Sequence, residues 1–362
     1  MSASRQSIIT GLSVIGVLAI QRNLSYNNTK SLLYWRNIPV LSGFIFELAH
    51  YKYIDYLLSL SIVVAAADFE ISQFIDFVQA VPSLRRVKNL FNKLDDIVDN
   101  NSVDQIYAYG EATLGTELSP FLLGLLDHED KRVVDQLIAD NMITRDEMIS
   151  FCNVLANKLF MQTMLTNDYN LAESDTLKAE IRQQIAKENL EISGCYLALV
   201  IHFIKKDPRI KRLILSPGHQ GLNYEEISLI YPTVTKAGEL MQIAHDTPEF
   251  RYDLRNQPRI GKISANYFLA QLESNGCKTD FIKALPALPS RPVTVVELPE
   301  RTRMVLNKVE HQFINEANKL GTSIGITCRL AWFHNKHVGF YEEKPSYYEK
   351  QKLHPPMMAC KL

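Results

Sequence analysis

Apolar residues repeat at helical spacing along almost the whole chain, and this pattern limits the fold more than any other feature. Leu84, Val87, Leu90, Phe91 and Leu94 are separated by three, three, one and three residues, which places them on one face of a helix. The sequence shows no alternation of strands with helices, which a parallel α/β sheet requires. We therefore predict an all-α fold.

The boundaries of the elements follow from capping and proline signals. The patterns Thr144-x-x-Glu147 and Asn223-x-x-Glu226 indicate two helix starts. The segment 285–299 contains four of the fifteen prolines, together with a β-prone valine-rich stretch, and predicts a non-helical connection. We expect a helical core over residues 1–285, an extended connector over 286–298, C-terminal helices packed on the core over 299–340, and a tail over 341–362.

Charge and cysteine usage restrict the partners and the compartment. The 39 basic and 40 acidic residues give a net charge of −1, so no basic excess indicates a nucleic acid partner. The five cysteines are scattered and form no CxxC pair, which suits a reducing compartment and predicts a cytoplasmic location. The sequence does not indicate an oligomeric state.

Two apolar runs, Ile8–Ile20 and Tyr56–Ala67, are the candidates for contact with a membrane. Each is about a dozen residues long, whereas a membrane-spanning helix needs about 20. We expect both to be buried helices and leave a peripheral contact with lipid open.

A first acidic cluster, Asp95, Asp96 and Asp99, ends the amphipathic run that begins near Leu84. The spacing brings the three carboxylates to one side of a helix end, where they repel one another and the helix dipole disfavours them. A Mg²⁺ ion would relieve this repulsion, because it prefers oxygen ligands. The alternative is a solvated acidic face that leads into a turn.

A second polar cluster lies about 150 residues later, between Gln242 and Asp253. His245, Glu249 and Asp253 are spaced i, i+4, i+8, and Asp246 begins an overlapping line to the same two acids. Two acidic helix faces that meet across a bundle would hold metal ions that bind a diphosphate. The cations beside this cluster that could neutralise the phosphates are Arg251, Arg255, Arg259 and Lys262.

Pro248 leaves two interpretations of this segment open. Thr247 is a good N-cap and Pro248 a good first residue, so a helix could begin here. Otherwise one helix continues through the proline, at a cost of about 3 kcal/mol, and is kinked.

The two clusters together resemble the motifs of class I isoprenoid (terpenoid) synthases. Leu94-Asp95-Asp96-Ile97-Val98-Asp99 is similar to their aspartate-rich DDxxD motif, and most similar to the form in phytoene and squalene synthases, where an aromatic and a basic residue precede it, as Phe91 and Lys93 do here. His245, Glu249 and Asp253 fall on the three positions of the later metal helix. The resemblance implies a helical bundle around a central cavity, two or three Mg²⁺ ions, and ionisation of an allylic diphosphate.

The resemblance also implies roles for individual residues. Those it assigns to catalysis are Asp95, Asp96, Asp99, Glu249 and Asp253. These five are also expected to bind Mg²⁺, and Asp246 joins them if the cluster follows the register of polyprenyl diphosphate synthases. The residues expected to contact the isoprenoid diphosphate are Lys93, Gln242, His245, Arg251, Arg255, Arg259 and Lys262. We thus expect prenyl transfer or condensation of the phytoene/squalene synthase type, with a terpene cyclase or a catalytically inactive helical interaction protein as alternatives.

Overall fold

A computed structural model describes residues 143–216, 221–260 and 263–340, together with the isolated positions 132, 135, 138, 139 and 141. Helices account for 82% of the described residues, and none of these residues belongs to a strand. The prediction of an all-α fold is therefore confirmed for this part of the chain. The first acidic cluster, Lys93, both apolar runs and the tail 341–362 lie outside it.

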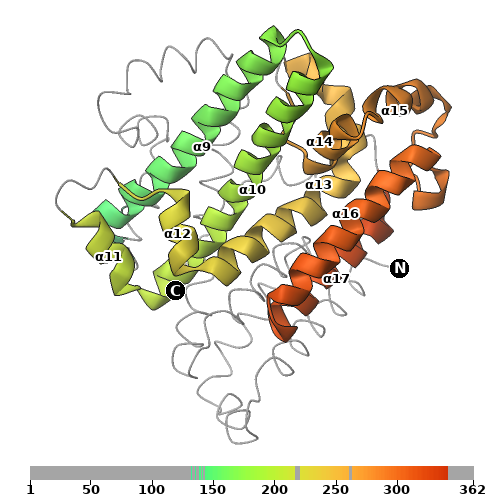
Figure 1. Ribbon diagram of the computed structural model, residues 1–362. Helices are drawn as coiled ribbons and strands as arrows, with labels where there is room; N and C mark the ends of the chain where they lie inside the picture. The colour runs from blue at the N-terminus through green and yellow to red at the C-terminus, as the bar shows by residue number, and fades with distance from the viewer. Residues whose placement is uncertain are drawn as a thin grey trace, which may run out of the picture.

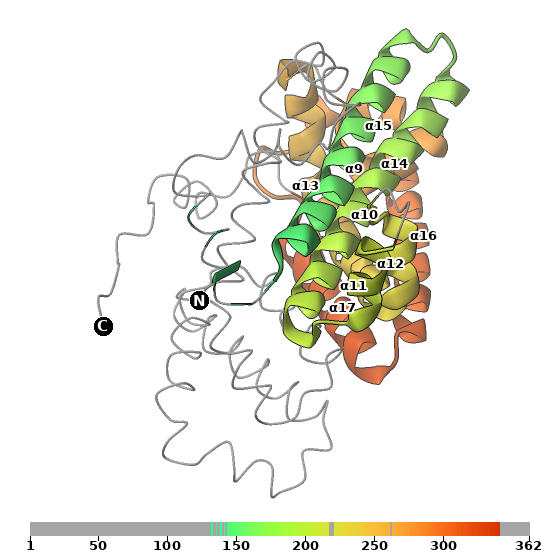
Figure 2. The same cartoon turned by 90° about the vertical axis from the view of Figure 1, so that its left-hand side faces the viewer.

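The described helices form a row, with α10 and α13 at its centre (Figures 1 and 2). On one side α9 packs against α10, and on the other the hairpin of α16 and α17 packs against α13. Among the shorter helices, α12 and α14 each pack against both central helices. The bounds are α9 (Arg145–Leu171), α10 (Asp175–Lys205), α11 (Pro208–Ile214), α12 (Tyr224–Ile230), α13 (Pro232–Ile260), α14 (Tyr267–Ser274), α15 (Lys278–Ala284), α16 (Glu300–Lys319) and α17 (Thr322–Val338).

Local capping sets two of the helix starts, as the sequence predicts. The Thr144 hydroxyl accepts a hydrogen bond from the Glu147 amide at 3.3 Å, and the Glu147 carboxylate accepts one from the Thr144 amide at 2.9 Å. Asn223 and Glu226 form the same reciprocal pair at the start of α12. These bonds satisfy amide groups that the first helical turn leaves without partners.

Glycines let the two central helices approach closely. A Cβ atom on Gly238 of α13 would lie 2.6 Å from the Ser193 carbonyl oxygen of α10, and one on Gly194 would lie 2.8 Å from the Thr235 oxygen. Real side chains do not fit at such distances, so α10 and α13 are in backbone contact here. This contact fixes the helix that carries the second polar cluster.

Helix α13 continues through Pro248, so the interpretation that a helix begins at this residue is wrong. A proline cannot donate to the carbonyl four residues earlier, which is that of Ala244. Asn335 of α17 replaces the missing donor: its Nδ2 donates to the Ala244 oxygen at 2.9 Å in a buried position. Thr247 Oγ1 also donates to the Ile243 oxygen at 2.7 Å. The contact with α17 therefore replaces the hydrogen bond that α13 loses at Pro248.

The segment between α15 and α16 contains two 3₁₀ turns, Leu285–Ala287 and Val295–Glu297, and no α-helix. Val293 and Phe340 form an isolated antiparallel bridge that ties this segment to the residues after α17. Within the described residues, no helix is both long enough and apolar enough to cross a membrane.

We predict that Asn335→Leu destabilises the fold by about 1–3 kcal/mol, because the Ala244 carbonyl is then buried without its donor. In a Pro248→Ala background the loss should be smaller, since the backbone amide that this substitution restores can bond the Ala244 oxygen itself. Urea unfolding of both single variants and the double variant measures this coupling. Asn307→Leu, on the exposed face of α16, is the control. An equal loss in both backgrounds would contradict the assigned role.

Candidate functional site

The second polar cluster lies on the unbroken helix α13, as the spacing requires. His245 Nε2 lies 3.7 Å from Glu249 Oε2, and the Glu249 side chain is only 9% exposed whereas that of His245 is 37% exposed. Asp253 follows one turn later on the same side. The helix thus presents an imidazole and two carboxylates in one line, which we call the acidic row (His245, Glu249 and Asp253).

Asp246 faces a different environment, because it is held by hydrogen bonds from α13 and α14. Gln242 Nε2 donates to its Oδ1 at 2.7 Å, and the Tyr267 amide donates to its Oδ2 at 2.9 Å. Gln242 in turn accepts a bond at 2.6 Å from the Ser193 hydroxyl of α10. Two of the predicted site residues, Gln242 and Asp246, are therefore brought together in a partly buried network that joins three helices.

Burial raises the pKa of Asp246 to about 7, against the opposing effects of the Tyr267 amide, the nearby His245 and the Gln242 amide, which favour the carboxylate. A carboxyl with such a pKa is partly protonated near neutral pH. Its oxygens already accept protein hydrogen bonds, so Asp246 fits a structural role in the network better than it fits a metal ligand.

Asn266, just before α14, connects this network to the acidic row. Its Nδ2 donates to the Asp246 carbonyl oxygen at 2.6 Å and to Asp253 Oδ2 at 2.7 Å. Its Oδ1 accepts from the Leu269 amide at 3.1 Å and caps α14. Asn266 was not among the residues predicted from the sequence. An Asn before the apolar run of α14 could have indicated the cap, but not the bond to Asp253.

Of the cations predicted to bind phosphate, the structure describes the side chains of Arg251 and Arg255. Arg251 is buried, and its guanidinium donates to the carbonyl oxygens of Pro289 at 2.9 Å, Phe340 at 3.0 Å and Arg291 at 3.3 Å. It therefore holds the connector against α13, a contact that the helical spacing did not indicate. Arg255 is exposed on α13. Arg259 lies in α13, but its side chain is outside the described part, as is Lys262 altogether.

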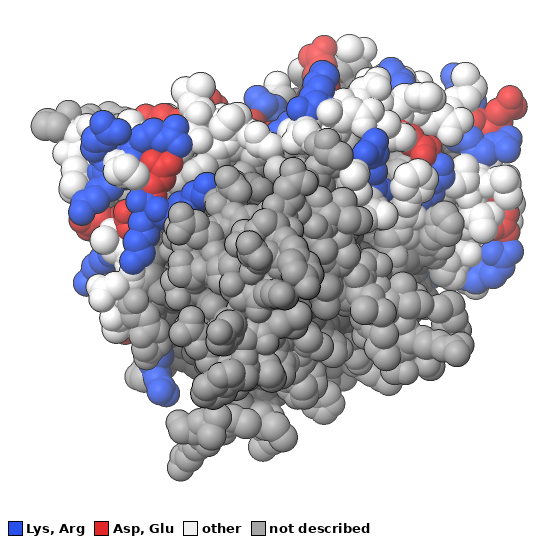
Figure 3. Space-filling view, turned by 90° about the horizontal axis from the view of Figure 1, so that it is seen from below, with Lys and Arg blue, Asp and Glu red and all other residues white. Residues whose placement is uncertain are grey.

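One group of exposed cations lies far from the acidic row. This group consists of four exposed residues at the end of α10 and in α11: Lys205, Lys206, Lys211 and Arg212. Figure 3 shows basic side chains gathered with acidic ones along the left edge of the molecule. Arg182 Nη1 donates a hydrogen bond to the Ser264 oxygen, so Arg182 lies at the end of α10 that is near α14. Lys205 lies 23 residues further on, or about 35 Å along the helix axis. This group cannot serve a ligand bound at Asp253.

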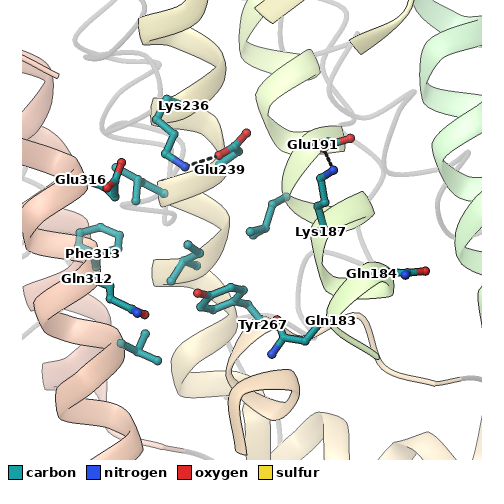
Figure 4. A pocket seen from close by; sticks show the side chains of 14 residues that line it. Gln183, Gln184, Lys187, Glu191, Lys236, Glu239, Tyr267, Gln312, Phe313 and Glu316 are labelled. Carbon is teal, nitrogen blue, oxygen red and sulfur yellow. Dashed lines mark hydrogen bonds and ion pairs between the residues drawn. The ribbon is translucent and has the colours of Figure 1, made fainter. Parts of the chain in front are cut away.

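A cleft of about 630 Å³ lies between α10, α13, α14 and α16 (Figure 4). Leu240 and Ile243 of α13 line it, and the Tyr267 ring projects into it. Lysine–glutamate pairs line its upper part, with Lys236 Nζ 2.8 Å from Glu239 and Lys187 Nζ 3.4 Å from Glu191. Helical periodicity places Leu240 and Ile243 on a different face of α13 from Glu249, so the cleft is not the site predicted from the motifs.

The side chains of the acidic row could supply only part of the ligands that one magnesium ion needs. Carboxylates such as Glu249 and Asp253 are the ligands that Mg²⁺ takes from proteins, commonly one or two per ion, with phosphate and water completing the shell. Across residues 143–216, 221–260 and 263–340 no three His, Cys, Asp or Glu side chains form a group that could hold a metal ion. The first acidic cluster (Asp95, Asp96 and Asp99), predicted to supply the remaining ligands, lies outside these ranges.

Comparisons with known proteins do not identify the chain. No protein-family model, no curated protein and no solved structure matches it. The assignment of a function therefore depends on the two motifs and on the geometry around α13.

We predict that Asp246 makes a contribution to the stability of the protein that is lost as the pH rises from about 4 to about 7. The folded state keeps the Asp246 proton over this range while the unfolded state has lost it, and the slope can reach about 1.4 kcal/mol per pH unit. Asp246→Asn should remove this contribution, because the Gln242 amide can reverse and accept from the new amide group. Unfolding measured at pH 5 and pH 8 tests this: the variant should gain stability relative to wild type at pH 8, and an unchanged difference would refute it.

Proposed function

We propose that the chain is a Mg²⁺-dependent isoprenoid-diphosphate enzyme that ionises an allylic diphosphate for prenyl transfer or condensation, in the manner of phytoene and squalene synthases. One observation carries the proposal: α13 runs unbroken through Pro248, so that His245, Glu249 and Asp253 share one helix face. A proline that ended the helix would have separated His245 from the two acids. The DDxxD-like cluster at Asp95–Asp99 is the proposed partner of this face.

Each group would have a limited task. Glu249 and Asp253 would bind one Mg²⁺ ion, and Asp95, Asp96 and Asp99 the others; the metal ions supply the positive charge that stabilises the departing diphosphate. His245 lies beside Glu249, where it can orient that carboxylate or donate to a phosphate oxygen. Arg255 and, beyond it, Arg259 and Lys262 are the proposed cations on the phosphate side. Gln242 supports Asp246 and so acts on the site through the network rather than on the substrate.

A second candidate is a helical interaction protein without catalytic activity. The observation in its favour is that protein donors already bond Asp246 and Asp253, through Gln242, the Tyr267 amide and Asn266. Such bonds are also found around working metal ligands, where they orient the carboxylate. A terpene cyclase of the same chemistry would differ from the leading proposal only in its product.

We predict that purified protein with Mg²⁺ releases diphosphate from farnesyl or geranylgeranyl diphosphate, and that Glu249→Gln slows this release on the order of 100-fold, because a neutral amide is a poor magnesium ligand. Asp168→Asn, which removes an exposed carboxylate from α9, is the matched control and should keep full activity. Circular dichroism checks that helical content is unchanged.

The products separate the candidates. A compound built from two prenyl groups joined head to head supports the leading proposal, and a cyclic hydrocarbon supports the cyclase. Full activity of Glu249→Gln counts against the metal assignment. Absence of any turnover with both substrates favours the interaction protein.

A further inference from the structure

We propose that the cleft between α10, α13, α14 and α16 binds an uncharged, elongated small molecule with an apolar body and a hydrogen-bond acceptor at the end near Tyr267. The cleft has a volume of about 630 Å³. Small-molecule sites usually enclose about 300–1,000 Å³. Binding here does not require the chemistry proposed for the acidic row, because the two lie on different faces of α13.

The length of the cleft suits a small molecule better than a docked helix. Its wall on α10 extends from Gln183 to Glu191, which is roughly 12 Å along the helix axis. Its wall on α16 extends from Val309 to Glu316, roughly 10 Å, and α13 lies between the two walls (Figure 4). A partner helix would make only about two turns of contact, too few for a stable isolated helix. One elongated ligand would occupy the whole length.

Apolar atoms make up most of the cleft surface, and these receive the body of the ligand. Leu240 and Ile243 contribute from α13, and the Tyr267 ring adds an aromatic face at one end. The other apolar side chains of the lining are Leu190, Val309 and Phe313. Covering this surface removes it from water, which is the main driving force for binding an uncharged ligand.

The Tyr267 hydroxyl gives the cleft a polar end. The Tyr267 amide donates to Asp246 Oδ2 at 2.9 Å and so anchors the residue, but within the described part of the chain its hydroxyl has no hydrogen-bond partner. Burial raises the pKa of this phenol, so it stays protonated at neutral pH and can donate. Figure 4 shows the Gln312 side chain also pointing into the cleft. A carbonyl, ether or hydroxyl oxygen of the ligand would accept from Tyr267.

The charged side chains along the cleft favour a ligand without charge. They are three glutamates and two lysines: Glu191, Glu239, Glu316, Lys187 and Lys236. Lys187 Nζ lies 3.4 Å from Glu191, Lys236 Nζ lies 2.8 Å from Glu239, and Glu316 is paired with Lys319 at 2.6 Å. An anion such as diphosphate would therefore meet net negative charge, and a cation would find each glutamate already paired.

The test measures binding of Prodan, an uncharged naphthalene ketone whose fluorescence shifts to the blue in apolar sites. Wild-type protein should bind it more tightly than anilinonaphthalene sulfonate, which has a similar ring system but a negative charge. Tyr267→Phe keeps the amide bond to Asp246 and loses only the hydroxyl, so it should weaken Prodan binding about 2- to 10-fold. Tyr252→Phe removes a hydroxyl from α13 outside the cleft and is the matched control.

A second variant places bulk in the cleft. Gln312 is exposed on α16, so Gln312→Trp should fill part of the cleft without disturbing the core and weaken Prodan binding on the order of 10-fold. Asn307→Trp places the same side chain on the opposite, exposed face of α16 and should bind as wild type does. Circular dichroism confirms that all variants are folded.

Weaker Prodan binding in Tyr267→Phe and Gln312→Trp, with both controls unchanged, supports the site. Wild-type affinity in folded Gln312→Trp, or no Prodan binding by the wild-type protein, would overturn it. Unchanged affinity in Tyr267→Phe, or tighter binding of the sulfonate, would overturn the stated class of ligand. Affinity that falls as the protein concentration rises would assign the cleft to a second copy of the chain instead. None of these results depends on diphosphate release, so they are separate from the test of the proposed function.

Discussion

The hydrogen bond from Asn335 to the Ala244 carbonyl oxygen is the interaction on which the central helix depends. Pro248 removes the amide that would normally bond Ala244, and this carbonyl is buried, so it needs another donor. The C-terminal hairpin supplies one from α17, 91 residues away in sequence. As a result α13 extends from Pro232 to Ile260 and keeps its polar residues in a single register. The packing of α17 is thus part of the geometry of the acidic row.

The polar network around Asp246 extends this constraint from one helix to three. Ser193, Gln242 and Asp246 join α10 to α13, and the Tyr267 amide and Asn266 join α13 to α14. Burying a carboxyl group is costly unless its oxygens are hydrogen-bonded, and each Asp246 oxygen has a donor. The close backbone contact at Gly194 and Gly238 leaves little room for α10 and α13 to slide. The site is therefore built on rigid neighbours, which suits a place where charges must be held at fixed positions.

Much of the fold follows from local patterns, whereas the environment of each polar residue does not. The caps at Thr144 and Asn223 could be predicted because capping involves residues three apart. The common helix face of His245, Glu249 and Asp253 could also be predicted, because it depends only on their spacing of four residues. Pro248 was ambiguous, since local preference favours a helix start and only the distant Asn335 decides for continuity. Arg251 has helical spacing suited to a phosphate site, yet it binds connector carbonyls, because spacing does not say which neighbour a face meets. Asn266 carries no motif at all, and its bond to Asp253 exists only in the folded chain.

The central claim is that the carboxylates of α13 hold a divalent cation for a diphosphate. A crystal structure of the full chain grown with Mn²⁺ and inorganic diphosphate tests it most directly, through the anomalous signal of the metal. We expect a manganese peak within about 2.0–2.4 Å of a Glu249 or Asp253 oxygen and bridged to phosphate, with Asn266 still bonded to Asp253. Manganese and diphosphate bound elsewhere, with both carboxylates contacting only protein groups, would contradict it.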